Sequence, residues 1–376
     1  MRSGSETAMR QPQAEWIAGR PESAALTRLG EQPLFREGWY RVGNHCYAWM
    51  VPNGSWGETN IGLIECDGQS VLVDTCWDVK LTQQMLSLAG DVLARSPIEY
   101  VINTHSDGDH CWGNQLFRDK TIIATDACIR QMRETQPHSL RALKLGGRLL
   151  RRLPLLGLDR FGHYMSRMFE PYDFVGIQIT EPREGFSGKK VINVKGVEVV
   201  IIEVGPSHTD GDAVVFVPGE RVVYAGDTVF FGSTPVMWSG PIERLVEDLK
   251  RLLTLEVDVI VPGHGPVGTP ADVHRVIEYW DFLQTELRRR FSLGMSHLEA
   301  AREVVFSPAF RTSEFAGWDS PERIVTNAYS LYRHWGASVS PPPGPFGRMN
   351  LMRQQAGLVF ELPGVTPQAM RHFAAQ

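Results

Sequence analysis

The chain has 376 residues, of which 43% are hydrophobic and 22% charged, and its formal net charge is −5. This composition is typical of a folded globular protein and excludes wholesale disorder, and the acidic balance gives no reason to expect a nucleic-acid partner. The length allows one or two domains.

The cysteine pattern and the hydropathy of the chain bear on its location. Five cysteines occur without CxxC spacing, which argues against both a disulfide framework and a cysteine zinc site. The N-terminal residues lack the apolar segment of a secretory signal, and no run approaches the length of a membrane span. We therefore expect a cytoplasmic protein with no stable membrane insertion, and a homo-oligomer remains open.

The first half of the chain predicts strands followed by alternating helices and strands. Residues 1–35 are polar and predict a flexible N-terminal arm. Short β-prone runs at 47–51, 59–66 and 70–76 are separated by turn residues, which indicates an antiparallel meander. Residues 80–96 have helical spacing of Leu and Met, 98–105 and 121–125 are apolar strands, and a helix is expected from Asp126.

The second half contains two segments that depart from this rhythm. Residues 136–186 are rich in Leu and Arg, and we interpret them as an inserted helical lid. Strands then resume at about 189–230, followed by a helix at 241–255 and a buried strand at 257–265. Residues 271–340 predict a helical C-terminal extension, and the PPPGPFG run at 341–347 predicts an irregular tail over 341–376.

Metal-competent side chains gather where predicted strands end. The stretch NTHSDGDHCWGN (103–114) holds two histidines and two aspartates: His105, Asp107, Asp109 and His110. Three later apolar runs also end near such a residue, at His208, Asp227 and His264. Buried imidazoles and carboxylates need a compensating partner, so we expect these strand ends to converge on one pocket.

This arrangement resembles the metallo-β-lactamase fold superfamily of metallohydrolases. The family pattern is H-x-H-x-D-H, then a distant His, an Asp after a strand, and a His in a G-H-G-like turn. The resemblance covers residues 47–268 and implies an α/β (α+β) fold, a four-layer αβ/βα sandwich with one or two metal ions at the edge of its paired sheets. We expect the catalytic domain to span 36–270, including the insertion.

The resemblance also implies a role for each candidate residue. The first metal would be held by His105, Asp107 and His208. The second would be held by Asp109, His110 and His264, and Asp227 would bridge the two. Asp109 would in addition be the catalytic residue that orients the attacking hydroxide. One or two divalent ions are expected, with zinc first.

One position departs from the family pattern, because Asp107 stands where most members have histidine. A carboxylate is a harder ligand than imidazole, so iron or manganese becomes an alternative at the first site. A carboxylate here also resembles the flavodiiron branch of the fold, although we find no flavodoxin-like domain. Asp107 could instead lie outside the ligand set and leave a weak first site.

The predicted function is metal-dependent hydrolysis of an ester, thioester, lactone or amide bond in a partly apolar small molecule. We expect the leucine face of the lid to overhang the metal pocket. Two alternatives stay open: a non-haem diiron redox enzyme, and a non-catalytic binding protein with a degenerate site. Residues 320–336 also resemble the C-terminal helices of uncharacterised hydrolase-like members of the superfamily, which names no substrate.

Overall fold

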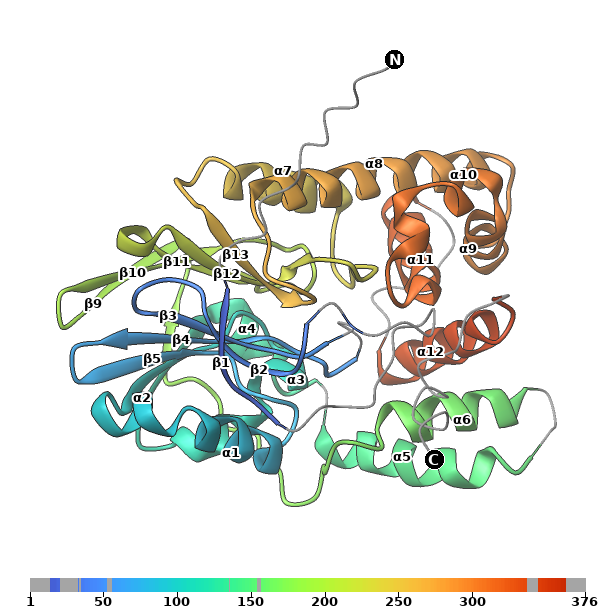
Figure 1. The fold of residues 1–376 in the computed structure, drawn as a ribbon. Coiled ribbons are helices and arrows are strands. Elements are labelled where there is room, and N and C mark those ends of the chain that lie inside the picture. Colours follow the sequence, from blue (N-terminus) through green and yellow to red (C-terminus); the bar gives the residue numbers. More distant parts are fainter. Residues whose placement is uncertain are drawn as a thin grey trace, which may run out of the picture.

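A computed structural model describes residues 14–20, 33, 35–52, 56–134, 136–153, 157–336 and 344–362. Within these residues the strands form two sheets that pack face to face, with helices on both outer faces (Figure 1). The predicted α/β four-layer sandwich is confirmed.

The first sheet carries the strands of the predicted meander. Its order is β1-β2-β3-β4-β5-β6-β7-β8, antiparallel as far as β5 and parallel from β5 to β8. The strands are β1 Glu15–Ala18, β2 Gly38–Arg41, β3 Cys46–Met50, β4 Ile61–Cys66, β5 Gln69–Val73, β6 Ile98–Ile102, β7 Thr121–Thr125 and β8 Glu184–Phe186. β1 lies within the predicted N-terminal arm and pairs with β2, so that prediction is wrong for Glu15–Ala18; residues 1–13, 21–32 and 34 lie outside the described residues.

The second sheet has the order β13-β12-β11-β10-β9. Its strands are β9 Lys189–Val194, β10 Val197–Glu203, β11 Ala213–Val217, β12 Val222–Phe230 and β13 Val259–His264. β12 and β13 are parallel, whereas the other pairs are antiparallel. The C-terminal ends of β12 and β13 therefore lie at the same edge of this sheet.

Three apolar layers hold the sandwich together. Between the sheets, Ile64 and Val73 of the first sheet share a buried cluster with Ile201 and Val215 of the second. The outer face of the first sheet packs against α1 (Val79–Leu88) and α2 (Gly90–Arg95). The outer face of the second sheet packs against α7 (Ile242–Leu252) and α8 (Pro270–Ser292). Burial of alternate strand residues on both faces is what such a four-layer arrangement requires.

The insertion folds as two helices beside the sandwich. α5 (Pro137–Leu150) and α6 (Leu158–Met168) pack against each other after the short helix α4 (Asp126–Gln131) (Figure 1). The buried side of α6 presents Phe161, Tyr164 and Met165 to a cluster that also contains Trp112. The insertion is therefore anchored through aromatic and methionine side chains of α6.

The C-terminal region is a layer of helices next to α8. Its elements are α9 His297–Phe306, α10 Pro308–Arg311, η3 Glu314–Gly317, η4 Pro321–Arg323, α11 Ile324–His334 and α12 Pro345–Val359. The prediction of an irregular tail over 341–376 is wrong over Pro345–Val359, because α12 is a helix that packs against α6 and η4. Residues 341–343 and 363–376 lie outside the described residues. Pro345 stands in the first turn, where a missing N–H costs nothing.

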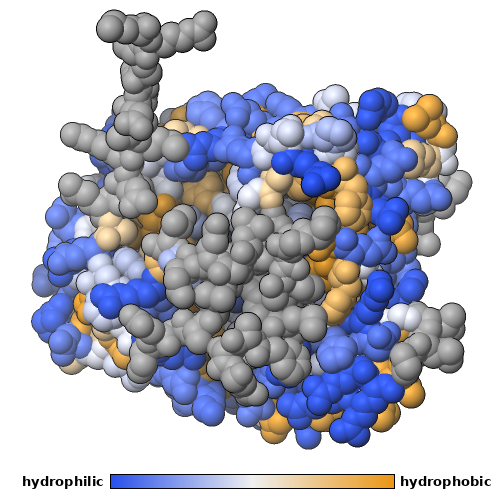
Figure 2. Space-filling model, turned by 45° about the vertical axis from the view of Figure 1, so that its right-hand side comes forward, coloured by the Kyte–Doolittle hydropathy of each residue, from blue (hydrophilic) through white to orange (hydrophobic). Residues whose placement is uncertain are grey.

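The exterior is mixed in character. On the face shown in Figure 2, hydrophilic side chains predominate and hydrophobic patches lie between them. All five cysteines are free and buried. None of the helices in the described part of the chain combines the length and the apolar character needed to cross a bilayer.

Candidate metal centre

The predicted metal ligands lie together at one edge of the sandwich, between the two sheets. Four of them follow β6, with two in the short helix α3 (Gly108–Cys111), and the others lie in the β10–β11 loop, in β12 and at the end of β13. They form three overlapping groups of potential ligand atoms: His105, His110 and Asp227; His105, Asp107 and His208; Asp109, His110 and His264. The last two groups have the composition of the two predicted metal sites, with Asp227 next to both.

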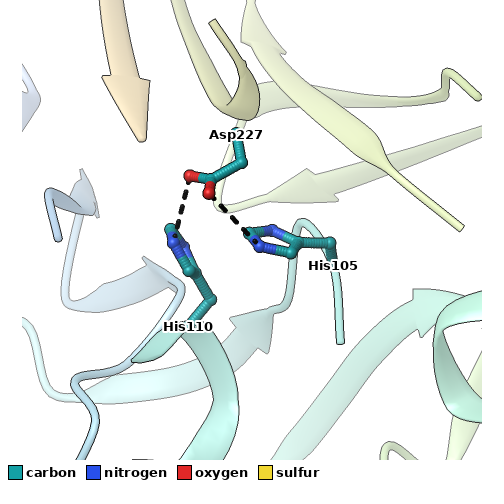
Figure 3. Close-up of side chains that lie close together, drawn as sticks. All are labelled: His105, His110 and Asp227. Carbon is teal, nitrogen blue, oxygen red and sulfur yellow. Dashed lines mark ion pairs between the residues drawn. The ribbon is translucent and has the colours of Figure 1, made fainter. Parts of the chain in front are cut away.

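Asp227 lies at the centre of the group. Its Oδ1 is 3.1 Å from Nε2 of His110 and 3.4 Å from Nε2 of His264. Its Oδ2 is 3.3 Å from Nε2 of His208 and 3.8 Å from Nε2 of His105. Figure 3 shows the two carboxylate oxygens directed at different imidazoles. Asp227 therefore has the geometry needed to bridge two cations.

The Nε2 atoms of His208 and His264 point into the site because hydrogen bonds to backbone carbonyls hold their Nδ1 atoms. Nδ1 of His208 donates to the Val236 carbonyl at 2.7 Å, and Nδ1 of His264 donates to the Glu58 carbonyl at 3.0 Å. Such contacts fix the ring orientation and tautomer, leaving Nε2 as a lone-pair donor.

Asp74 and Thr104 hold the other two histidines. Nδ1 of His110 lies 2.9 Å from Asp74 Oδ2, and Nδ1 of His105 lies 3.0 Å from Thr104 Oγ1. The Thr104 hydroxyl donates in turn to Asp74 Oδ2 at 2.7 Å. The buried Asp74 carboxylate thus orients both histidines of the 103–114 stretch, His110 directly and His105 through Thr104.

The two remaining carboxylates lie beside different histidines. Asp107 Oδ2 is 3.2 Å from His208 Nε2. Asp109 Oδ2 accepts from Thr59 Oγ1 at 2.9 Å and lies 3.7 Å from His264 Nε2. Both are less buried than the histidines, so they are accessible from the cavity side.

The donor set fits a divalent metal. Nε2 of His105, Nε2 of His110 and Oδ1 of Asp227 are buried and lack a well-directed hydrogen bond within the described part of the chain, and Asp227 lies 3.8 Å from His105 and 3.1 Å from His110. Leaving buried polar atoms unsatisfied costs about 1–3 kcal/mol each. A cation placed among them would satisfy all three.

The protonation of the metal-free cluster supports the same interpretation. Burial disfavours charge on His208, but the carboxylates of Asp227 and Asp107 outweigh it and raise the pKa of His208 to about 9. Burial is likewise outweighed at His110, whose pKa is raised by Asp227, Asp74 and Asp109. For His105, burial and the neighbouring His110 lower the pKa to about 3. Protons on two imidazoles thus supply positive charge that a metal would otherwise supply.

A small cavity opens onto the cluster. Its walls include three of the candidate carboxylates, His208 and His264, together with Trp56, Phe230, Val236, Trp238 and Arg323. None of the described residues of 136–186 lines it, so the prediction that the leucine face overhangs the pocket is wrong. Leu145 and Leu149 of α5 are 53% and 64% exposed. The insertion contacts the cavity wall from behind: Tyr172 Oη donates to the Trp56 carbonyl at 3.2 Å, and Trp56 packs against the cluster that contains Tyr164.

Several residues of the site were not identified from the sequence. Asp74 follows the apolar run of β5, and a strand-end aspartate is the same signal that pointed to Asp227. Thr59 and Thr104 carry no distinctive local pattern. Arg323 lies far along the chain from every predicted ligand, so only the fold brings it to the cavity.

A comparison with known protein families agrees with this geometry. The family model for the metallo-beta-lactamase superfamily matches residues 54–264. The chain belongs to the metallo-beta-lactamase superfamily. The matched region contains all seven predicted ligands, whereas α8 to α12 lie beyond it.

Individual relatives within the superfamily are distant. The chain is 25% identical over 238 residues to the 2,4-dinitroanisole O-demethylase subunit alpha of Nocardioides sp. (strain JS1661), a match covering 62% of this chain and 60% of that protein. It is 24% identical over 260 residues to a beta-lactamase-like protein 2 homolog of Caenorhabditis elegans, covering 69% and 72% respectively. The chain thus spans less than two thirds of the first relative.

A solved structure shares the fold. A stereoselective inverting sec-alkylsulfatase from Pseudomonas sp. superposes with a TM-score of 0.58 at 16% identity, over 83% of this chain and 52% of that one. This similarity concerns the fold alone.

Proposed function

We propose that the protein is a metal-dependent hydrolase acting on an ester, thioester, lactone or amide bond of a partly apolar small molecule. The observation that carries the proposal is the convergence of four imidazole Nε2 atoms on the two oxygens of Asp227. Superfamily membership supports it. The proposed catalytic domain spans 36–270, with the insertion at 136–186 and the helical extension after it.

The proposed ligand sets are those that the three overlapping groups allow. One ion would be held by His105, Asp107 and His208, the other by Asp109, His110 and His264, and Asp227 would contact both. Imidazole-rich donors favour zinc, whereas the Asp107 oxygen makes iron or manganese the alternative at the first site. We propose a cytoplasmic location because reduced, buried cysteines suit a reducing compartment.

The chain's own residues would bind and orient the reactants. A bound divalent ion would lower the pKa of a coordinated water and polarise the scissile carbonyl. Asp109, oriented by Thr59, lies on the cavity side and is the proposed acceptor of the water proton. Trp56, Phe230 and Trp238 would hold the apolar part of the substrate and keep bulk water away.

A redox function is the second candidate, and Asp107 is the observation that favours it. A carboxylate in the first group gives the oxygen-rich environment that iron accepts. A non-catalytic binding role would follow instead if Asp107 left the first site too weak to hold an ion.

Metal analysis combined with turnover separates these proposals. We expect about one or two equivalents of zinc or manganese per chain and chelator-sensitive, oxygen-independent hydrolysis of 4-nitrophenyl butyrate. The Asp109→Asn variant should retain the ion held by His105, Asp107 and His208, bind the second ion more weakly and lose most of this activity. Stoichiometric iron with oxygen-dependent turnover would favour the redox function. Metal-loaded protein inactive toward esters, thioesters, lactones and amides would favour the binding role.

A further inference from the structure

A buried arginine from the C-terminal extension lies in the wall of the metal cavity. Arg323 ends the 3-10 helix η4 and is only 2% exposed. It lies beyond residues 54–264, the region matched by the family model. A guanidinium keeps its charge even when buried, so this position carries a permanent cation.

Aromatic rings link Arg323 to the candidate ligands. The Phe230 ring stacks on His264 with centroids 4.9 Å apart and an interplanar angle of 9°. The Arg323 guanidinium carbon lies 5.6 Å from the centroid of that Phe230 ring and 5.1 Å from the Trp56 ring. The Phe230 ring therefore links the Arg323 guanidinium to His264, a candidate metal ligand, and all three residues line the same cavity.

A permanent cation in this position is not explained by metal binding. It cannot ligate a metal, and its charge disfavours the approach of further cations in a partly buried cavity. The same charge favours a substrate that carries an anionic group on an otherwise apolar molecule, since guanidinium pairs strongly with carboxylates and related oxyanions. The adjoining Trp56 and Phe230 rings provide the apolar surface.

We propose that Arg323 recognises an anionic group on the substrate, so that the enzyme prefers a carboxylated or similarly charged ester to a neutral one of the same size. This inference rests on the proposed hydrolase function and narrows its substrate class. Arg323 is a specificity-determining residue in this proposal, and the reacting bond lies nearer the metal ligands.

A second arginine of the extension lies near the metal cavity, with its Nη2 4.0 Å from Glu134 Oε2. The guanidinium carbon of Arg348, in α12, lies 5.1 Å from the Trp238 ring. Trp238 lines the metal cavity and also an adjoining cavity shared by Arg348 and Asp107.

Arg323 also has structural contacts that any test must separate from ligand binding. Its Nη1 donates to Ser233 Oγ and to the Thr234 carbonyl, both at 3.1 Å. A purely structural role predicts that its loss affects all substrates alike. Recognition of an anion predicts a loss confined to charged substrates.

The test compares 4-nitrophenyl hemisuccinate, which ends in a carboxylate, with neutral 4-nitrophenyl butyrate. We expect the wild-type holoenzyme to have the higher kcat/KM for the hemisuccinate. Arg323→Gln should reduce the ratio of the two kcat/KM values at least about tenfold, mainly through KM, and Arg323→Lys should restore part of it. Arg290→Gln is the matched control, because Arg290 is also buried but lies in the outer helices, where it pairs with Glu286 and Glu303 and does not line the metal cavity.

A binding measurement keeps the inference testable apart from turnover. Calorimetric titration of the zinc-loaded protein with 4-phenylbutyrate and with 4-phenylbutanamide should show tighter binding of the anion, lost in Arg323→Gln and kept in Arg290→Gln. Equal binding of the two probes, no binding of either, or an equal effect of Arg323→Gln on both would overturn the inference. Absence of ester hydrolysis with intact anion preference would count against the proposed function alone.

Discussion

Asp74 holds His110 in place from behind, with Oδ2 of the carboxylate 2.9 Å from the imidazole Nδ1. Both side chains are almost fully buried, so water cannot replace this contact. The same oxygen accepts the Thr104 hydroxyl that lies beside His105. Orientation of two candidate ligands therefore depends on one residue outside the ligand set.

Replacing Asp74 with asparagine should weaken metal binding. Asp74 Oδ2 accepts from His110 and from the Thr104 hydroxyl, while Oδ1 accepts from the Thr104 N–H at 2.7 Å. An Asn amide of similar shape would turn a donor NH2 toward one of these donors, so we expect zinc affinity to fall about 10- to 100-fold. Chelator competition measures the affinity. Asp78→Asn is the matched control: Asp78 is also buried, but it caps α1 by accepting from Leu81 N at 2.6 Å. Equal losses of zinc affinity in both variants would mean that Asp74 affects metal binding only through the stability of the fold.

Metal binding should release protons at pH 7.5. The pKa of His208 is raised to about 9 by Asp227 and Asp107 against the effect of burial, and that of His110 is raised as well, so both imidazoles carry protons in the metal-free protein. Coordination requires neutral imidazole, and we expect about one or more protons released per chain. Calorimetry in buffers of different ionisation enthalpy measures this number, which should decline at pH 9.5.

The same shifts give the metal-free protein a defined pH dependence. A histidine whose folded pKa lies above its unfolded value contributes stability that is complete below about pH 6.5 and lost as pH rises through about 9. Urea unfolding of the chelator-treated protein should show this decline. No proton release at pH 7.5 and a flat stability profile would contradict the proposed charge on His208.

The ligand set could be anticipated because each member lies near the end of an apolar run with a local signature. The 103–114 stretch follows β6, Asp227 lies within β12 and His264 ends β13, all close to glycine, and chain order alone suggested their convergence. Asp74 also ends an apolar run, but its role becomes clear only from its contacts with Thr104 and with His110, 36 residues away. Arg323 reaches the cavity only because η4 and α11 fold back beside the second sheet.

Two predictions were wrong because composition does not show which way the side chains of an element point or what packs against them. The leucines of α5 suggested a buried face toward the pocket, yet Leu149 is exposed, and Leu143 of α5 packs against the cluster that contains Phe161 of α6. The proline run at 341–347 suggested irregular chain, but a proline also suits the first turn of a helix, and Leu351 and Leu358 of α12 are buried. Periodicity identified apolar faces without showing what covers them.

Replacing Gly263 with alanine should displace Asp227. An added Cβ at Gly263 would come within 1.9 Å of Asp227 Oδ1 and 2.8 Å of the Gly226 carbonyl carbon, so either β12 or β13 must shift. We expect a loss of about 1–3 kcal/mol in the free energy of unfolding and a larger relative loss of metal affinity. Urea unfolding and chelator competition measure the two effects.

A matched glycine lies in α5, where a Cβ at Gly146 would meet no atom within 4 Å. Gly146→Ala should leave metal binding unchanged and stabilise the helix by up to about 1 kcal/mol. Unchanged zinc affinity in Gly263→Ala would show that Asp227 tolerates displacement and is not the bridge between two ions.

Replacing Asp107 with histidine should shift metal preference toward zinc. Asp107 Oδ2 lies 3.2 Å from His208 Nε2 in the first candidate group, and an imidazole there is a softer donor than a carboxylate. We expect the ratio of bound zinc to bound iron, measured by elemental analysis after loading from an equimolar mixture under reducing conditions, to rise several-fold. Asp210→His provides the control, since Asp210 lies on the same loop as His208 but contacts Ser239 instead. An unchanged ratio of zinc to iron in Asp107→His would place Asp107 outside the ligand set. A raised ratio together with a large gain in ester hydrolysis would show that the natural carboxylate limits hydrolysis at this site.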